Sequence, residues 1–153
     1  MASVVGIPIA EGLWFHAATV DDTLPVITLW QACHLVRAWN DPVEDIHFRL
    51  QPPASELLLA FEGDEIVSSI MMGNDGHRGW IYYLGVSPTR RRGGIARALM
   101  VQAEQWMCAR GVPKMHAMIR HDNLEVRSFY TALGYADDDV SVVEKFLNGQ
   151  SKT

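Results

Sequence analysis

The stretch "WIYYLGVSPTRRRGGIARALM", residues 80–100, constrains the fold more than any other part of the chain. Its aromatic and β-branched start predicts a buried strand over 80–86, with Gly85 as a bulge or a point of close approach. From 94 to 110 the apolar residues follow helical spacing, and Gly111 ends the predicted helix. A strand that passes directly into a helix leaves unpaired backbone N–H groups, and the positive end of the helix dipole, at the connecting turn.

The residues of this turn suit a phosphate group. Gly93 and Gly94 allow close approach, since a Cβ there would hold a pyrophosphate away from the amides. Arg91 and Arg92 can add charge-assisted hydrogen bonds. The Walker loop and the dinucleotide fingerprint are both absent, which disfavours ATP and NAD. A solvated basic turn without a ligand is the alternative.

The remaining sequence predicts an α+β domain with a mixed sheet. Apolar alternation and turn residues indicate further strands, and three- and four-residue apolar spacing indicates further helices. The predicted strands lie at 13–18, in a hairpin within 56–73, at 114–120 and at 140–147, and the predicted helices lie at 22–36, 42–50 and 123–133. The resulting order is β-α-α-β-β-β-α-β-α-β.

Composition limits the size and the class of the protein. A chain of 153 residues with 48% hydrophobic residues predicts one domain over 1–153. A net charge of -5 disfavours nucleic-acid binding, although a local basic patch stays compatible with it. No segment approaches the roughly 20 apolar residues of a membrane helix. We expect a cytoplasmic protein that does not bind membranes, with Cys33 and Cys108 as buried free thiols.

Two motifs together resemble the GNAT superfamily of N-acetyltransferases. The first is Arg91-x-x-Gly94-x-Ala96 after a strand that ends in L-x-V, which resembles the family's coenzyme A motif. The second is "DNLEVRSFYTALGY" at 122–135, where Val126 replaces the alanine usual in the family. The resemblance covers roughly residues 55–147 and implies the GNAT fold, a mostly antiparallel mixed sheet flanked by helices.

The resemblance also implies an activity. The family transfers the acetyl group of acetyl-CoA to an amine, here a primary amine of a small molecule or a peptide, without a metal. The phrases "LWQACHLVRAWNDP" and "GNDGHRGWIYYLGV" resemble the YpeA-like bacterial branch. The identity of the acceptor, the acyl chain lengths tolerated and the oligomeric state, including a homodimer, are left open.

The family's cofactor-binding roles carry over to specific positions. Backbone groups of Leu84 and Val86 would pair with the pantetheine arm of acetyl-CoA. The diphosphate would bind the turn residues, which are Arg91, Arg92, Gly93, Gly94 and Ala96. An oxyanion develops during attack on the thioester, and a backbone N–H near Leu84 could stabilise it. Asn123 is either a further cofactor contact or a plain helix N-cap.

The candidate catalytic residues lie on the second motif and in the turn before the strand. Tyr130 matches the family tyrosine that donates a proton to the leaving sulfur, and its alternative is an ordinary core tyrosine. Some members carry a glutamate base on the strand ahead of L-x-V, but this chain has Trp80 to Tyr83 there. His77 is the candidate base, against the alternative that "DGHRG" is a polar hairpin turn. The histidines are spread over different elements and suggest no metal site.

The acceptor side is expected to involve the connection between the first two helices. The candidate acceptor-binding residues are Trp39, Asn40, Asp75 and Tyr82. Two other function classes compete with the enzyme. One is an acyl-CoA-binding regulatory domain without turnover, which the missing strand carboxylate permits. The other is an RNA-binding α+β module, which the net charge disfavours.

Overall fold

A mixed, mostly antiparallel sheet organises the first two-thirds of the chain, in a computed structural model that describes residues 5–8, 12–50 and 54–152. The strands lie side by side in sequence order, and only the last pair is parallel. Their bounds are β1 Val5–Pro8, β2 Leu13–Ala17, β3 Ser55–Glu62, β4 Glu65–Asn74, β5 Gly79–Val86 and β6 Met115–Ala117. The predicted α+β class with a mixed sheet is confirmed.

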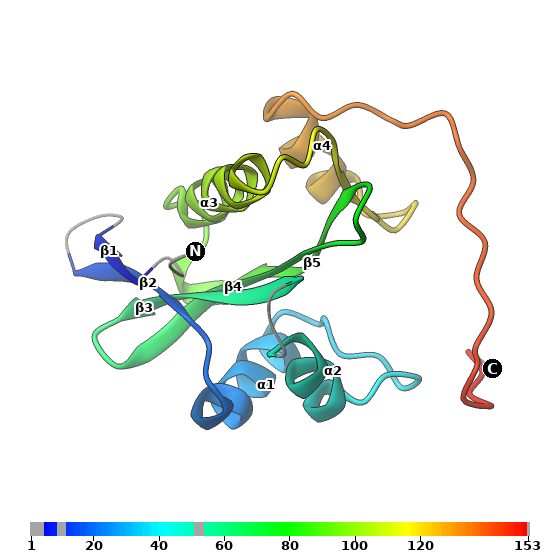
Figure 1. Ribbon diagram of the computed structural model, residues 1–153. Coiled ribbons are helices and arrows are strands. Elements are labelled where there is room, and N and C mark those ends of the chain that lie inside the picture. Colours follow the sequence, from blue (N-terminus) through cyan, green and yellow to red (C-terminus); the bar gives the residue numbers. More distant parts are fainter. Residues whose placement is uncertain (1–4, 9–11, 51–53, 153) are drawn as a thin grey trace. The chain divides into compact units, whose positions relative to one another are not determined.

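Helices cover both faces of this sheet (Figure 1). Two helices lie on one face and α3 lies on the other. The bounds are α1 Thr23–Ala32, α2 Pro42–Arg49 and α3 Ile95–Ala109, with short 3-10 turns η1 Val20–Asp22 and η2 Pro88–Arg90. Side chains of α1, β3 and β4 form the core between sheet and helices, where Trp30, Leu57 and Leu59 are fully buried. The first helix therefore packs its indole directly against the sheet.

The chain divides into two units by its contacts, Met1–Ala117 and Met118–Thr153. The sheet and the helices named above belong to the first unit. The second contains α4, Leu124–Ala132, and the residues that follow it. A single domain over 1–153 stays a prediction. No helix among the described residues is both long enough and apolar enough to cross a bilayer.

Several predicted bounds differ from the structure. The first helix ends at Ala32, not at residue 36, because His34 adopts a left-handed φ of 56° that cannot continue a helix. The predicted strand at 114–120 is reduced to β6, since only Met115 to Ala117 pair with β5. Strand β1 was not predicted, and it pairs antiparallel with β2.

The predicted strand at 140–147 is wrong. This segment pairs with no strand in the described part of the chain. Its side chains are exposed, with Val143 at 91% and Leu147 at 92% of full exposure. Strand propensity reflects packing against neighbouring strands, so an apolar run without a partner strand does not form one. The exposure of Cys108 also corrects the expectation that both cysteines are buried.

The start of α2 supplies a first testable prediction. Asp41 caps this helix, because its Oδ1 accepts hydrogen bonds from the Val43 and Glu44 amides at 2.9 and 3.3 Å. We expect Asp41→Ala to lower the free energy of unfolding by about 1 kcal/mol, the usual effect of losing an N-cap. That corresponds to a melting temperature roughly 2–4 °C lower. Asp41→Asn retains an acceptor and should melt like the parent; equal melting of all three would contradict the capping role.

Candidate active site

The site begins where the last two strands diverge. Strand β5 pairs with β4 as far as Val86 but with β6 only over Gly79 to Ile81. Residues 82–86 therefore lack a strand neighbour on the β6 side within the described sheet. An unpaired strand edge presents main-chain donors and acceptors that an extended ligand can use.

The direction of the backbone N–H and C=O groups along β5 decides which residues can hydrogen-bond a ligand at this edge. The Ser87 amide donates to the Val67 carbonyl on β4 at 2.8 Å, and the Gly85 carbonyl accepts from Ser68 Oγ at 2.7 Å. Backbone groups of successive strand residues point to opposite sides. Leu84 and Val86 therefore direct theirs away from β4, toward the open edge. These are the two residues expected to contact the pantetheine arm.

A bulge interrupts β5 beside this edge. The pairing with β4 shifts between Ser69, opposite Gly85, and Met71, opposite Tyr82, so β5 carries one extra residue. Tyr83 there has a left-handed φ of 52°. Gly85 is instead the point of close approach, because a Cβ on it would lie 2.8 Å from Leu35 Cδ1. The sequence identified the close approach but not the position of the bulge.

Side chains from three elements meet at Tyr83. Its ring stacks on Trp30 of α1, with centroids 3.8 Å apart, and its hydroxyl donates to Asp45 Oδ2 of α2 at 2.6 Å. Burial, followed by the hydrogen bond and charge of Asp45, raises the pKa of the Tyr83 phenol well above its usual value. The hydroxyl therefore stays protonated and acts as a donor. Sequence reasoning missed Asp45, because no local pattern links it to residue 83.

The phosphate turn leads from β5 into α3. Gly94 precedes the helix with φ 79°, a left-handed conformation that suits glycine. The first helical hydrogen bond runs from the Ala98 amide to the Gly94 carbonyl at 3.0 Å. The amides of residues 95–97 precede this bond, and in the described structure they have no acceptor. They are therefore available at the positive end of the α3 dipole.

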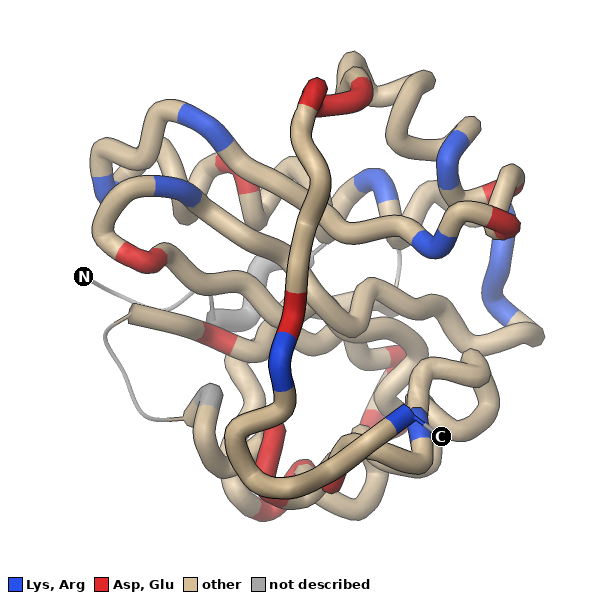
Figure 2. Tube along the Cα trace, turned by 90° about the vertical axis from the view of Figure 1, so that its right-hand side faces the viewer, with Lys and Arg blue, Asp and Glu red and all other residues tan. Residues whose placement is uncertain are grey.

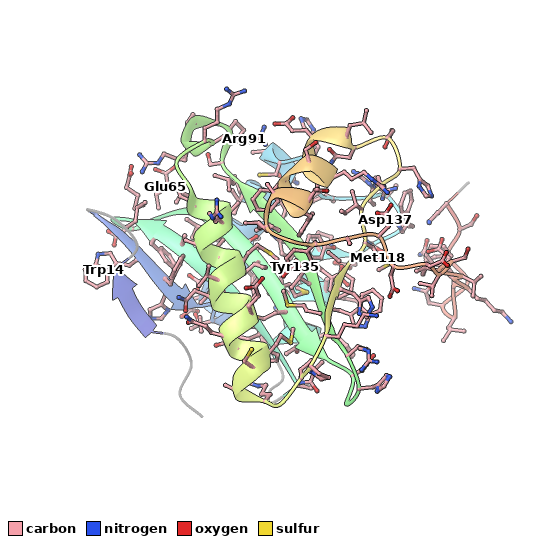
Figure 3. The ribbon with its side chains drawn as sticks, turned by 90° about the horizontal axis from the view of Figure 1, so that it is seen from above. Trp14, Glu65, Arg91, Met118, Tyr135 and Asp137 are labelled. Carbon is pink, nitrogen blue, oxygen red and sulfur yellow. The ribbon has the colours of Figure 1, made fainter. Side chains whose placement is uncertain are left out.

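The arginines of the turn differ in their partners. Charged residues of both signs are spread along the chain (Figure 2). Arg90 forms an ion pair with Glu62 Oε2 at 2.6 Å. Arg91 lies in the loop at the start of α3 (Figure 3), and its Nε donates to the Val86 carbonyl at 3.1 Å. Arg92 is exposed and adopts φ 67°. Arg90 thus anchors the turn to β3, which leaves Arg91 and Arg92 as the candidates for an anionic ligand.

A thiol lies beside the same carbonyl. Cys33 Sγ donates to the Val86 carbonyl at 3.3 Å, so this oxygen is shared with Arg91, and the Val86 N–H is the group left for a ligand at the open edge. Burial raises the pKa of the Cys33 thiol, and the neighbouring Arg91 lowers it by a smaller amount. The thiol is thus held mainly in its neutral form, as a hydrogen-bond donor.

The candidate base lies at the opposite end of β5. Asp75 Oδ1 accepts from the His77 and Arg78 amides at 2.8 and 2.7 Å, which is the geometry of a capped turn. These hydrogen bonds, that of Arg78 first, lower the pKa of the exposed Asp75 carboxyl. Leu84 lies six residues after Arg78 along the strand, a span of roughly 20 Å. His77 as the base and Asp75 as an acceptor-binding residue stay predictions, and a reaction at Leu84 would lie at the other end of this strand.

The other candidate acceptor residues lie nearer to the bulge. Asn40 is exposed and contributes a side-chain hydrogen bond to Tyr83. Trp39 is half-buried in the same connection between α1 and α2. Tyr82 packs against the core cluster around Trp30. Asn40 is thus linked to the bulge through the Tyr83 side chain, and Tyr82 directly precedes Tyr83 in the strand.

The second unit carries the other motif. Asn123 caps α4, since its Oδ1 accepts from the Val126 amide at 3.2 Å. Tyr130 is buried, with its ring 5.5 Å from that of Tyr135 at 72°. Burial raises the pKa of the Tyr130 phenol to about 12. No group of three potential metal ligands occurs among the described residues.

Comparison with known proteins identifies the family. The acetyltransferase (GNAT) family profile matches residues 24–135. The chain belongs to the GNAT acetyltransferase family. It is 47% identical over 127 residues to Acetyltransferase ECA0875 of Pectobacterium atrosepticum, and the match covers 83% of this chain and 90% of that protein. The protein is therefore an acetyl-CoA-dependent acetyltransferase.

Solved structures agree with this fold. An aminoglycoside acetyltransferase, meta-AAC0020 from an uncultured soil metagenomic sample in complex with sisomicin, superposes with a TM-score of 0.74 at 17% identity, covering 92% of this chain and 100% of that chain. A predicted acetyltransferase with acetyl-CoA from Clostridium acetobutylicum gives a TM-score of 0.72 at 15% identity, with coverage of 87% and 96%. The fold predicted from the two motifs is confirmed.

Proposed function

We propose that the acetyltransferase moves the acetyl group of acetyl-CoA to a primary amine of a small molecule or a peptide by direct attack. The observation that carries this proposal is the open edge of β5 at residues 82–86, which continues into the turn before α3. An extended thioester arm fits the first feature and a diphosphate fits the second. Acetyl-CoA has both parts.

The turn would bind the diphosphate through main chain and guanidinium groups. The unpaired amides at 95–97 point their N–H groups toward the turn, and Gly93 and Gly94 leave the backbone uncovered. Arg91 and Arg92 would supply charge-assisted hydrogen bonds. Asn123 uses its Oδ1 as a cap, so a cofactor contact by this residue would fall to its Nδ2.

The chemistry is acyl transfer. The nitrogen of a neutral amine attacks the thioester carbonyl, and the oxygen of that carbonyl becomes an oxyanion that the Leu84 N–H would stabilise. The C–S bond then breaks, CoA leaves as a thiolate, and the new amide loses the proton that the attacking amine carried. We assign protonation of the thiolate to Tyr130 on the strength of its motif. The base that takes the amine proton is unassigned.

The acceptor class is part of the proposal. The solved relative described above is named an aminoglycoside acetyltransferase. A small cationic amine is accordingly the first candidate acceptor, ahead of a peptide amino terminus. We also assign the chain to the YpeA-like bacterial branch, on the phrases at 29–42 and 73–86.

Binding and turnover can be tested separately. We expect acetyl-CoA at a hundred times its Kd to stabilise the protein by about 2.7 kcal/mol. This corresponds to a rise in melting temperature of roughly 5–10 °C, and single-stranded RNA should give none. Free CoA thiol is then measured with sisomicin, spermidine and a peptide with a free amino terminus. Stabilisation without thiol release from any amine would favour the regulatory acyl-CoA-binding alternative.

A further inference from the structure

Tyr83 occupies a backbone conformation that it would not adopt alone. Its φ of 52° is left-handed, where a residue with a Cβ is sterically disfavoured. Such a conformation persists only when the surrounding structure imposes it. It also sits directly before Leu84, whose N–H faces the open edge of β5. The contacts that impose this conformation come from β4, α1 and α2.

A buried hydroxyl holds the carbonyl of Tyr83. Ser69 Oγ on β4 donates to the Tyr83 carbonyl at 2.8 Å and accepts from Trp30 Nε1 of α1 at 2.9 Å. Ser69 and Trp30 are both fully buried. The hydroxyl has one proton to donate, and the indole N–H takes a lone pair, so the orientation of the proton toward Tyr83 is fixed.

The side chain of Tyr83 is held at its other end. The ring lies parallel to the Trp30 indole, at an interplanar angle of 8°, and the hydroxyl binds Asp45 of α2. Tyr83 is thus held at its carbonyl by Ser69 of β4 and at its hydroxyl by Asp45 of α2. Trp30 of α1 contacts both the Tyr83 ring and Ser69. Bonds at both ends leave Tyr83 little freedom to relax toward an ordinary strand conformation.

We propose that Trp30, Ser69, Tyr83 and Asp45 form a bulge clamp that positions the Leu84 N–H for the oxyanion of the reaction. The inference rests on the proposed function and assigns positioning residues to it. A donor must lie within hydrogen-bonding distance of where the oxyanion forms, so a small displacement of the bulge weakens the transition state more than the ground state. The clamp therefore acts on kcat and not on acetyl-CoA binding.

The chain offers a matched pair of variants. Ser68 and Ser69 are adjacent on β4, fully buried, and each donates to a β5 carbonyl, but Ser68 binds Gly85 and not the bulge. Ser68→Ala and Ser69→Ala both lose one buried hydrogen bond to a β5 carbonyl, and Ser69→Ala should lose more thermal stability because it also leaves the Trp30 indole N–H without its acceptor. We expect only Ser69→Ala to lower kcat, by at least about tenfold, with the KM for acetyl-CoA changed by less than about twofold.

Two reactions and two further variants sharpen the test. Thiol release is measured with sisomicin or spermidine and also without amine, since hydrolysis of acetyl-CoA passes through the same oxyanion and should fall by the same factor. Ser69→Thr keeps the hydroxyl and should recover most of the rate. Tyr83→Phe keeps the stacked ring, and combined with Ser69→Ala it should cost less than the product of the separate losses, because both act on one bulge.

A measurement without turnover makes the inference independent of the reaction. Amide NMR signals of Tyr83 and Leu84 should move in Ser69→Ala and stay in place in Ser68→Ala. Unmoved signals in Ser69→Ala, or equal losses of kcat in the two variants, would overturn the clamp. A protein that binds acetyl-CoA, shows the signal changes and never releases thiol would instead contradict the proposed function and leave the clamp as a structural device.

Discussion

Gly94→Glu is expected to abolish the stabilisation of the protein by acetyl-CoA. A carboxylate at residue 94 would lie beside the unpaired amides of residues 95–97, where the proposal places the diphosphate. The added side chain also opposes the φ of 79° that the turn requires. Repulsion and lost amide contacts together should weaken binding by roughly a hundredfold or more, since charge-assisted hydrogen bonds are the strong ones.

Gly111→Glu is the matched control for this variant. Gly111 has φ 72° at the other end of α3, with no atom within 4 Å of an added Cβ, as at Gly94. Both variants introduce the same charge and similar backbone strain. Melting curves with and without acetyl-CoA should show lower stability in both, and the ligand-induced rise only in Gly111→Glu. If acetyl-CoA raised the melting temperature of Gly94→Glu as much as that of the parent, the diphosphate would have to bind elsewhere.

The turn could be predicted from sequence because its determinants are local. A short stretch of sequence shows Gly94 between a strand and a helix. In the structure this glycine adopts the left-handed conformation. The assignment of Leu84 and Val86 to cofactor binding came from the resemblance to the family, and the structure has both residues on the part of β5 that β6 leaves unpaired. What the sequence did not reveal is that Arg90 is engaged by Glu62, which lies nearly thirty residues earlier.

The bulge could not be predicted, because its cause is distant in sequence. Glycine is the residue expected at a left-handed position, so Gly85 was the natural candidate. The structure assigns that conformation to Tyr83, and the contacts that hold it come from α1, α2 and β4. A local rule fails where tertiary contacts stabilise a conformation that the residue itself disfavours.

The local pattern of the segment at 140–147 predicts a strand that the described structure does not contain. Its apolar residues satisfy the local pattern of a strand, yet a strand is defined by hydrogen bonds to a neighbour. No described strand pairs with it. His77 as the base stays a prediction: it is close to β5 in sequence, but the length of an extended strand separates it from Leu84.

Tyr130→Phe should lower kcat by roughly a hundredfold, the scale of losing a general acid. The KM for acetyl-CoA should change little, since only the hydroxyl is removed and the ring keeps its packing. Burial raises the pKa of this phenol to about 12, above its usual value near 10, so the proton is retained to higher pH. The parent enzyme should accordingly show no loss of kcat near pH 10 from ionisation of Tyr130.

Tyr135→Phe separates this acid role from a loss of packing. The two rings contact each other edge to face, so both variants remove a hydroxyl from the same aromatic cluster. Thiol release from acetyl-CoA, measured across pH at saturating amine, should fall only for Tyr130→Phe. A proton donor must be protonated at the working pH, and burial keeps the Tyr130 phenol protonated there while making it a weaker acid. Equal kcat in Tyr130→Phe and the parent would mean that water or another group protonates the sulfur.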